Sequence, residues 1–291
     1  MKYEITHRTT YTYSEPVTLG HNSTHLAPRT LARQRCTANR LVILPVPSSQ
    51  RSWTDYFGNQ VTYFTVEEEH RELTVTAISE VAMETAPPPA ATQNAAWEEA
   101  LPRHRDADDL SAAPYSFDSP CVRRDDRLAS YAAMSFTPGR PLLEAALDLT
   151  GRIFHEFKYD PTATSVSTPT MEVFEKRRGV CQDFAHLEIG CLRSLGLAAR
   201  YVSGYLLTDP RPGQPRLVGA DASHAWLSVF CPGQGWIDFD PTNNVIPVMR
   251  HVTLAWGRDY GDVCPIKGVF LGGGSHWMTV AVDVVPRGGL C

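Results

Sequence analysis

The pattern of apolar residues changes at three consecutive prolines, residues 87–89, and this change divides the chain. Before the prolines, apolar and polar residues alternate, as in YEITHRTTYTY, which is typical of strands with one buried face. After residue 135, apolar residues recur at steps of three and four, which is typical of helices. Consecutive prolines continue neither a helix nor a central strand, so residues 87–96 are predicted to be a connector.

The N-terminal part, residues 1–85, is predicted to be an all-β unit. Gly58-Asn59 lies between two runs rich in aromatic and β-branched residues, which indicates a hairpin. The later run ELTVTAISEVAM alternates again. Residues 86–134 mix charged residues with further prolines, and we assign them to a connector with short helices.

The C-terminal part, residues 135–291, is predicted to contain helices followed by an antiparallel sheet. Pro141 suits the first turn of one helix, and a second helix is predicted from Cys181 to about Leu195, where Gly196 ends it. The strand-like runs that follow are ARYVSGYLLT, HAWLSVF, GWIDFD, HVTLAWGRDY and HWMTVAVDVV. The predicted fold class is therefore α+β, with an all-β unit followed by helices packed on an antiparallel sheet.

Composition argues against several classes of partner. The net charge is −5 and the isoelectric point about 6.1, which gives no support for a nucleic-acid or membrane partner. No run approaches the ~18 apolar residues of a membrane helix, and the N-terminus lacks the apolar segment of a signal peptide. The seven cysteines are scattered without a C-x-x-C pair, which favours a reducing, cytoplasmic location over a disulfide framework.

Cys181 differs from the other cysteines in its local position. It begins a predicted helix, where unpaired N–H groups and the helix dipole favour a thiolate. Arg177 and Arg178 precede it and favour the same charge, and Gly179 lets the backbone approach closely, as an oxyanion hole requires. From position alone, Cys181 is either a reactive thiol or a cysteine directed into the core.

A base for such a thiol is predicted from the stretch ASHAWLSVFCPGQGWIDFDPTNN. We expect a hairpin with its turn within residues 231–235, whose two strands direct their apolar faces to the same core. With Phe230 opposite Gln234, His224 falls opposite Asp240, with about 5 Å between their Cβ atoms. In this pairing, His224 could act as the base for Cys181, and Asp240 could orient that base.

Other residues remain alternatives or neighbours of this site. Asp238, on the same face as Asp240, and Asp221, in a loop, are alternative carboxylates. A metal bound by Cys181, His224 and Asp240 would lack a fourth ligand at typical spacing, so no metal is predicted. We expect packing or surface roles for His186, His251 and four further histidines, His21, His25, His155 and His276.

Four ordered motifs, GVCQDFAHL, GLAARYVSGY, ASHAW and GWIDFDPTNN, resemble the bacterial transglutaminase-like superfamily of Cys-His-Asp enzymes. The β unit resembles the bacterial transglutaminase-like N-terminal region, and HVTLAWGRDYGDVCPIKG resembles the segment that usually follows the core. The resemblance implies a papain-like fold with Cys181 as nucleophile, His224 as base and Asp240 as orienting carboxylate. The implied division is 1–85 N-terminal domain, 86–134 connector and 135–291 catalytic core with C-terminal strands.

The function implied by the resemblance is acyl transfer at amide bonds through a thioester, as in a transglutaminase-like peptidase, amidase or amide transferase. A peptide or protein substrate is expected, and no cofactor. The alternative is a non-catalytic binding or scaffold protein with a vestigial triad. The residues expected to contact substrate are Gln182, Glu188, Trp226 and Trp236.

Overall fold

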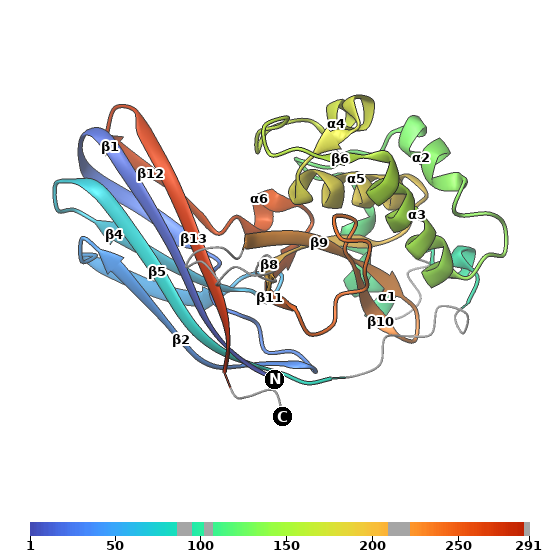
Figure 1. Ribbon diagram of the computed structural model, residues 1–291, viewed down its shortest axis with the longest axis horizontal. Helices are drawn as coiled ribbons and strands as arrows, with labels where there is room; N and C mark the ends of the chain where they lie inside the picture. Colours follow the sequence, from blue (N-terminus) through green and yellow to red (C-terminus); the bar gives the residue numbers. More distant parts are fainter. Residues whose placement is uncertain (86–94, 102–106, 209–221, 288–291) are drawn as a thin grey trace, which may run out of the picture.

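The computed structural model describes residues 1–85, 95–101, 107–208 and 222–287, and it shows a large antiparallel sheet beside an α+β core (Figure 1). Residues 86–94, which include the three prolines, and the alternative carboxylate Asp221 lie outside the described residues. In the described part of the chain, no helix is both long and apolar enough to cross a lipid bilayer.

The large sheet combines strands from both ends of the chain. The strands are β1 (Lys2–Thr24), β2 (Gln34–Leu44), β3 (Ser49–Thr54), β4 (Gln60–Val66), β5 (His70–Met83), β12 (Ile266–Gly272) and β13 (His276–Arg287). The long strand β1 lies in the middle of the sheet. Along one edge it pairs with β5 and β4, and along the other with β13 and β12.

The C-terminal strands therefore belong to the N-terminal sheet, whereas the sequence analysis assigned residues 135–291 to one core. Lys2 pairs with Arg287 and Tyr13 with His276, so β13 follows β1 along most of its length. The difference has a physical reason. Alternation predicts a strand with one buried face, but it does not specify which neighbour the strand pairs with.

The core contains a second sheet, several helices and short elements. The four-stranded sheet has the order β10-β9-β8-β11, with β8 (Ala199–Leu206), β9 (Ala222–Cys231), β10 (Gly235–Phe239) and β11 (His251–Gly257). The helices are α1 (Ala107–Ala112), α2 (Asp126–Ala133), α3 (Leu142–Glu156), α4 (Thr170–Lys176), α5 (Cys181–Ser194) and α6 (Tyr260–Val263). The short elements are η2 (Trp97–Ala100), η3 (Ala113–Ser116), β6 (Lys158–Tyr159) and β7 (Arg178–Gly179).

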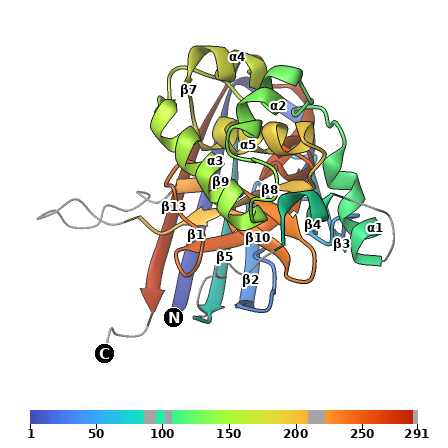
Figure 2. The same cartoon turned by 90° about the vertical axis from the view of Figure 1, so that its right-hand side faces the viewer.

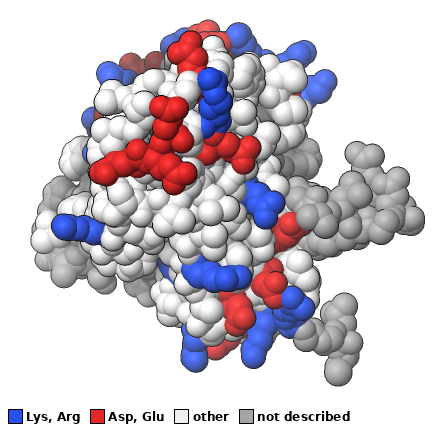
Figure 3. All heavy atoms as spheres, turned by 90° about the vertical axis from the view of Figure 1, so that its left-hand side faces the viewer, with Lys and Arg blue, Asp and Glu red and all other residues white. Residues whose placement is uncertain are grey.

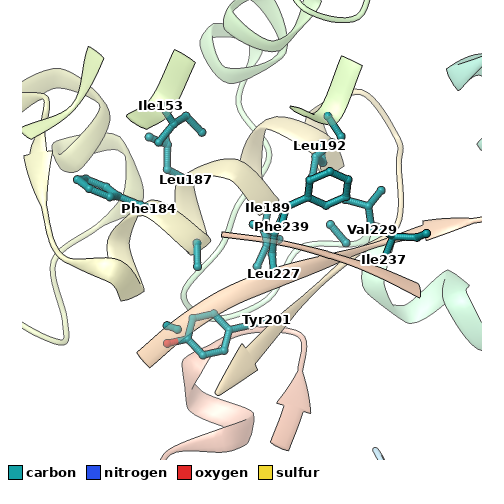
Figure 4. Close-up of a cluster of buried hydrophobic side chains, with 14 of the residues drawn as sticks. Ile153, Phe184, Leu187, Ile189, Leu192, Tyr201, Leu227, Val229, Ile237 and Phe239 are labelled. Carbon is teal, nitrogen blue, oxygen red and sulfur yellow. The ribbon is translucent and has the colours of Figure 1, made fainter. Parts of the chain in front are cut away.

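Helix α5 is the central element of the core. It contacts α2, α3 and α4 on one side and the strands β8 and β9 on the other, with the helices in front in Figure 2. Its side chains Phe184, Leu187 and Leu192 are buried, and Figure 4 shows them among apolar side chains of α3, β9 and β10. The two long helices predicted from apolar spacing are confirmed, and Pro141 directly precedes α3.

The N-terminal sheet is joined to the core by two buried side-chain amides. Gln34 donates to the Thr253 carbonyl at 2.7 Å and accepts from the Thr253 N–H at 2.8 Å. Asn59 makes the equivalent pair with the carbonyl and N–H of Trp256, at 2.9 and 3.0 Å. Both partners lie on β11, an edge strand of the core sheet, so the amides satisfy backbone groups that an edge strand leaves unpaired.

The outer surface of the N-terminal sheet is shown in Figure 3. Acidic side chains form one group in the upper half of this view, others lie at its top and lower edges, and basic side chains are scattered among uncharged ones. Over the described residues, this face therefore has no broad basic area of the kind that binds a nucleic-acid backbone.

The amide contacts predict a stability effect. Gln34→Leu should lower the free energy of unfolding by about 2–4 kcal/mol, because it leaves a buried N–H and a buried carbonyl of Thr253 unpaired. Urea denaturation measures the loss. Gln60→Leu is the matched control, since Gln60 is exposed and should change stability by less than about 0.5 kcal/mol. Equal losses in the two variants would contradict the assigned role of Gln34.

Candidate active site

Cys181 is the first residue of α5, and the preceding residues fix where this helix begins. The Asp183 carboxylate accepts hydrogen bonds from the Val180 N–H at 2.8 Å and from the Thr164 hydroxyl at 2.6 Å. A Cβ atom on Gly179 would lie 2.7 Å from Asp183 Oδ2, so only glycine fits at position 179 without a shift. The glycine of the RRGVC motif therefore serves the start of the helix that presents Cys181.

The two arginines before Cys181 are engaged elsewhere. Arg177 lies 3.3 Å from a Glu156 carboxylate oxygen, and its guanidinium covers the rings of Phe157 and Phe174. The Arg178 side chain is mostly exposed and lies 3.9 Å from Asp160. Both arginines thus contact groups other than the thiol, and the helix N-terminus remains the positive feature next to Cys181.

His224 and Asp240 meet beside the β9–β10 hairpin. The Nε2 atom of His224 lies 2.7 Å from Asp240 Oδ2, and both side chains are buried. This bond leaves Nδ1 of the ring unused by Asp240, and the neighbouring Cys181 side chain interacts with the His224 ring strongly enough to raise its pKa. The structure therefore brings together the three side chains for which the sequence analysis predicted catalytic roles.

The hairpin register differs by two residues from the predicted one. Phe230 pairs with Trp236, not with Gln234, because the turn begins one residue later. Gly233 and Gly235 have positive φ angles of 75° and 79°, which place the turn there. The faces of the strands are unchanged by a shift of two, so the expected side chains still point to one side. Asp240 reaches His224 diagonally from just beyond the paired residues.

Asp240 lies in a short turn that provides donors to its carboxylate. Oδ1 accepts the N–H groups of Thr242 and Asn243 at 2.9 and 3.2 Å. Oδ2 accepts the Asn243 side-chain amide at 2.7 Å in addition to His224. A side chain that accepts backbone N–H groups two or three residues later is typical of an Asx turn, so the motif DPTNN has a local structural reason. Asp238, the alternative carboxylate, is bound instead by Trp226 and Ser228.

The pKa values of the pair are shifted in opposite directions. Burial lowers the pKa of His224, but hydrogen bonds to Asp240 and Cys181 and their charges outweigh it and raise the pKa to about 10. Burial raises the pKa of Asp240, but the hydrogen bonds and charges of His224 and His251 outweigh it and hold that pKa well below its usual range. Both shifts favour a charged imidazolium beside a charged carboxylate at neutral pH.

A cavity of about 410 Å³ lies next to Cys181 and His224. Gln182 lines it, as expected for a substrate-contacting residue, and the Gln182 side chain donates to the Val166 carbonyl at 3.1 Å. The core also contributes the aromatic side chains of Tyr201 and Tyr260. The opposite wall comes from β1 and β13, so the N-terminal sheet forms part of the candidate active site.

Trp226 does not contact this cavity, contrary to expectation. It is fully buried, donates from Nε1 to Asp238, and its ring stacks on the His224 ring with 6.0 Å between centroids and 30° between planes. A Cβ atom on Gly204, the residue paired with His224, would lie 2.4 Å from the Trp226 ring. Trp226 therefore supports the histidine from within the core and does not bind substrate directly.

Glu188 and Trp236 are also away from the cavity. Glu188 is completely buried and accepts from the Thr150 hydroxyl at 2.7 Å, so it cannot contact a substrate. Its burial raises its pKa to about 8. Trp236 packs against Arg200 and Tyr115 and lines a second cavity. The position of each residue along its helix or strand predicts which side of the element it occupies. It does not predict which neighbouring segments pack on that side.

His251 is the residue that the sequence analysis missed. It begins β11, and its Nε2 atom lies 2.8 Å from Asp240 Oδ2, the oxygen that also binds His224. Among the described residues, His224, Asp240 and His251 form a group with ligand atoms within 4.8 Å of one another. Their mutual hydrogen bonds already occupy those atoms, so a metal is not needed to explain the arrangement. Only the pairing of β11 with β8 brings His251 here, and no local sequence signal reports that pairing.

Comparisons with known proteins identify the family. A model described as the bacterial transglutaminase-like N-terminal region matches residues 3–82, and one described as the transglutaminase-like superfamily matches residues 130–241. An uncharacterized protein of Mycobacterium tuberculosis is 44% identical over 293 residues, which cover 98% of this chain and 93% of that protein. The chain belongs to the transglutaminase-like superfamily and carries the bacterial transglutaminase-like N-terminal region.

Two further similarities are more limited. The protein-glutamine gamma-glutamyltransferase of Pseudomonas aeruginosa is 32% identical over 107 residues, 34% of this chain and 16% of that protein. The crystal structure of a candidate cysteine protease from Cytophaga hutchinsonii matches with a TM-score of 0.77 at 21% identity, over 100% of this chain and 92% of that one. The second similarity confirms the predicted α+β fold with a transglutaminase-like core.

The shifted pKa of His224 predicts an unusual titration. The His224 imidazole should lose its proton near pH 10 and not near 6.5, because Asp240 and Cys181 stabilise its charged form. Its contribution to stability is complete below pH 6.5 and is lost as the pH rises through about 10. Nuclear magnetic resonance of isotope-labelled histidine measures the midpoint, and Asp240→Asn should lower it.

His186 provides an internal control for this titration. Its burial lowers its pKa to about 4, although the charge of Asp259 opposes this shift. Its Nε2 atom accepts the Tyr260 N–H at 3.1 Å, in agreement with the expected packing role. The His186 signal should stay that of a neutral ring between pH 5 and pH 9, which are about one unit above its own pKa and below that of His224. A His224 midpoint near its unperturbed value would contradict the assigned ion pair.

Proposed function

We propose that this protein is a cysteine-dependent acyl-transfer enzyme that acts on amide bonds of a peptide or protein. The observation that carries the proposal is the arrangement of Cys181, His224 and Asp240 at the edge of a cavity, where Asp240 binds His224 and Cys181 lies beside that imidazole. A nucleophile, a base and an orienting carboxylate in hydrogen-bond contact are the minimal machinery for such chemistry. The raised pKa of His224 supports an imidazolium that is ready to donate a proton.

In the first half of the reaction, the Cys181 thiolate attacks the amide carbonyl carbon. A carbon–sulfur bond forms, and the carbonyl oxygen takes the negative charge. The N–H groups at the start of α5 have no partner within the helix, so we assign the Cys181 N–H as a donor to this oxygen. The carbon–nitrogen bond then breaks, the leaving nitrogen takes the proton of His224, and a thioester on Cys181 remains.

In the second half, a water molecule or an amine resolves the thioester. His224 removes a proton from the attacking oxygen or nitrogen, the carbon–sulfur bond breaks, and the thiolate–imidazolium pair is restored. Asp240 keeps its charge throughout and holds the imidazole orientation through Nε2. If water resolves the thioester the enzyme is a hydrolase, and if an amine does so it is a transferase. Both reactions require the same three side chains.

The similar proteins support this proposal to different extents, because only some of them carry a named activity. The relative from Pseudomonas aeruginosa is named as a glutamyltransferase, and the family model covers the segment that holds Cys181, His224 and Asp240. The relative from Mycobacterium tuberculosis carries no named activity. The proposal therefore depends on the geometry of the site and on the following experiment.

The acyl-enzyme can be trapped directly. The protein is incubated with a peptide library, quenched in acid, and the peptide containing Cys181 is examined by mass spectrometry. We expect an acyl adduct on Cys181 that hydroxylamine releases and that Cys181→Ala abolishes. Added primary amine then identifies the acceptor, since a transferase forms the new amide and a hydrolase forms the acid with or without amine.

Cys191 is the matched control within the same helix. It is fully buried, and burial raises the pKa of its thiol far above the ordinary value. At neutral pH, a small electrophile such as iodoacetamide should modify Cys181 and leave Cys191 unmodified. Faster modification of Cys191, or no acyl adduct on a reactive Cys181, would instead favour a binding or scaffold protein with a vestigial triad.

A further inference from the structure

The wall of the cavity opposite Cys181 is built by neighbouring residues of β1 and β13. Tyr11 pairs with Met278, and Thr9 pairs with Val280, so these side chains share one face of the N-terminal sheet. The next pair along this face is His7 and Val282, both buried. The two strands come from opposite ends of the chain, and the core provides only the other side of the cavity.

The β13 half of this wall is apolar, and the wall carries no formal charge near pH 7. Among the described residues that line the cavity there is no Lys, Arg, Asp or Glu. His7, the titratable imidazole of this wall, has a pKa lowered to about 4 by burial and is therefore neutral near pH 7. Met278 and Val280 remain 56% and 45% exposed although they face the cavity. Apolar side chains left open next to a candidate nucleophile indicate a surface that a ligand covers.

We propose that the β1–β13 wall, with Met278 and Val280 at its centre, binds a bulky uncharged apolar side chain next to the reacting amide of a peptide substrate. This inference rests on the proposed function and specifies its substrate class. A charged side chain would lose its hydration against this wall without gaining a partner, which is unfavourable. An apolar side chain would remove apolar area from water on both molecules.

The substrate is the occupant that the position of the wall favours. Met278 and Val280 line the same cavity as Cys181 and His224, so a chain that presents an amide to Cys181 lies against them. Trp277, on the opposite face of β13, is 61% exposed and does not line the cavity. Substitutions of Met278 and of Trp277 can therefore distinguish a role in substrate binding from a general effect on strand β13.

Peptide vinyl sulfones that carry Leu, Lys or Glu next to the electrophile test this proposal. We expect the Leu probe to modify Cys181 at least about tenfold faster than either charged probe, the scale at which an apolar pocket discriminates. Met278→Lys should slow the Leu probe by about tenfold and favour the Glu probe over the Lys probe. Trp277→Lys should leave all three rates within about twofold of the wild-type values.

Iodoacetamide separates a failure of this inference from a failure of the proposed function. Its reaction with Cys181 needs no substrate side chain, so the iodoacetamide rate of the unmodified sequence reports the nucleophile independently of the wall. Equal rates for the three peptide probes, with normal iodoacetamide reaction, would overturn the apolar wall and leave the proposed nucleophile intact. Equal effects of Met278→Lys and Trp277→Lys on the Leu probe would also overturn it.

A different observation carries a second inference, about His251. The Oδ2 atom of Asp240 accepts from His224, His251 and Asn243, at 2.7, 2.8 and 2.7 Å. His251 is buried, and its ring lies edge to face with the ring of Trp226, which also stacks on the ring of His224. The two histidines are thus held by one carboxylate and one indole.

The geometry points to His251 as a positioning residue for Asp240. Its Nε2–H and the Asn243 amide occupy two sides of Oδ2, so the side that remains open to His224 is fixed. A carboxylate held in this way keeps the imidazole plane, and hence Nδ1, directed to the thiol. His251 itself does not line the cavity of Cys181, so it acts through Asp240.

Two substitutions at position 251 test this role. His251→Leu removes the donor and should slow modification of Cys181 by the Leu probe by about tenfold, as loss of an orienting partner does in other sites. His251→Gln retains an N–H donor at a similar reach and should restore most of the rate. Thermal unfolding of both variants monitors folding. Wild-type rates in both variants, or the same loss in both, would contradict the positioning role.

Discussion

The buried carboxylate of Asp240 is the interaction on which the candidate site depends. It stays charged in the protein interior because five donors surround its two oxygens: two backbone N–H groups, one side-chain amide and two imidazoles. These donors come from β9, from β11 and from the turn that follows β10. The carboxylate therefore ties three segments of the core together, and the orientation of His224 toward Cys181 follows from that arrangement.

The long strand β1 has a comparable role for the cleft. It pairs with β5 on one edge and with β13 on the other, so it joins the two ends of the chain in one sheet. The inner face of this sheet contributes buried residues such as Tyr3 and Val284 to the same apolar cluster as α5 and β9. The N-terminal sheet therefore packs on the transglutaminase-like core, and it forms one wall of the cavity beside the candidate nucleophile.

Local patterns in the sequence predicted much of the site, for physical reasons that the structure makes visible. The period-two alternation of β9 and β10 placed His224 and Asp240 on one face, and this remained true although the register differed by two residues. The start of α5 at Cys181 was predicted from helix signals, and Asp183 and Gly179 explain it. Glu188 was misassigned because its position on the helix gives a direction, whereas the packing of Thr150 against it decides its burial.

The sequence by itself determined which segments form helices and which form strands, and which side chains share a strand face. It also indicated Cys181, His224 and Asp240 as a candidate catalytic triad. These properties depend on spacing within short segments, which apolar periodicity reports. Only the tertiary structure decided that β13 borders the cavity, that His251 shares the carboxylate of Asp240, and that Trp226 is buried behind the histidines. Those facts depend on which distant strands pair with each other. The alternation of residues within a strand does not specify its distant partner.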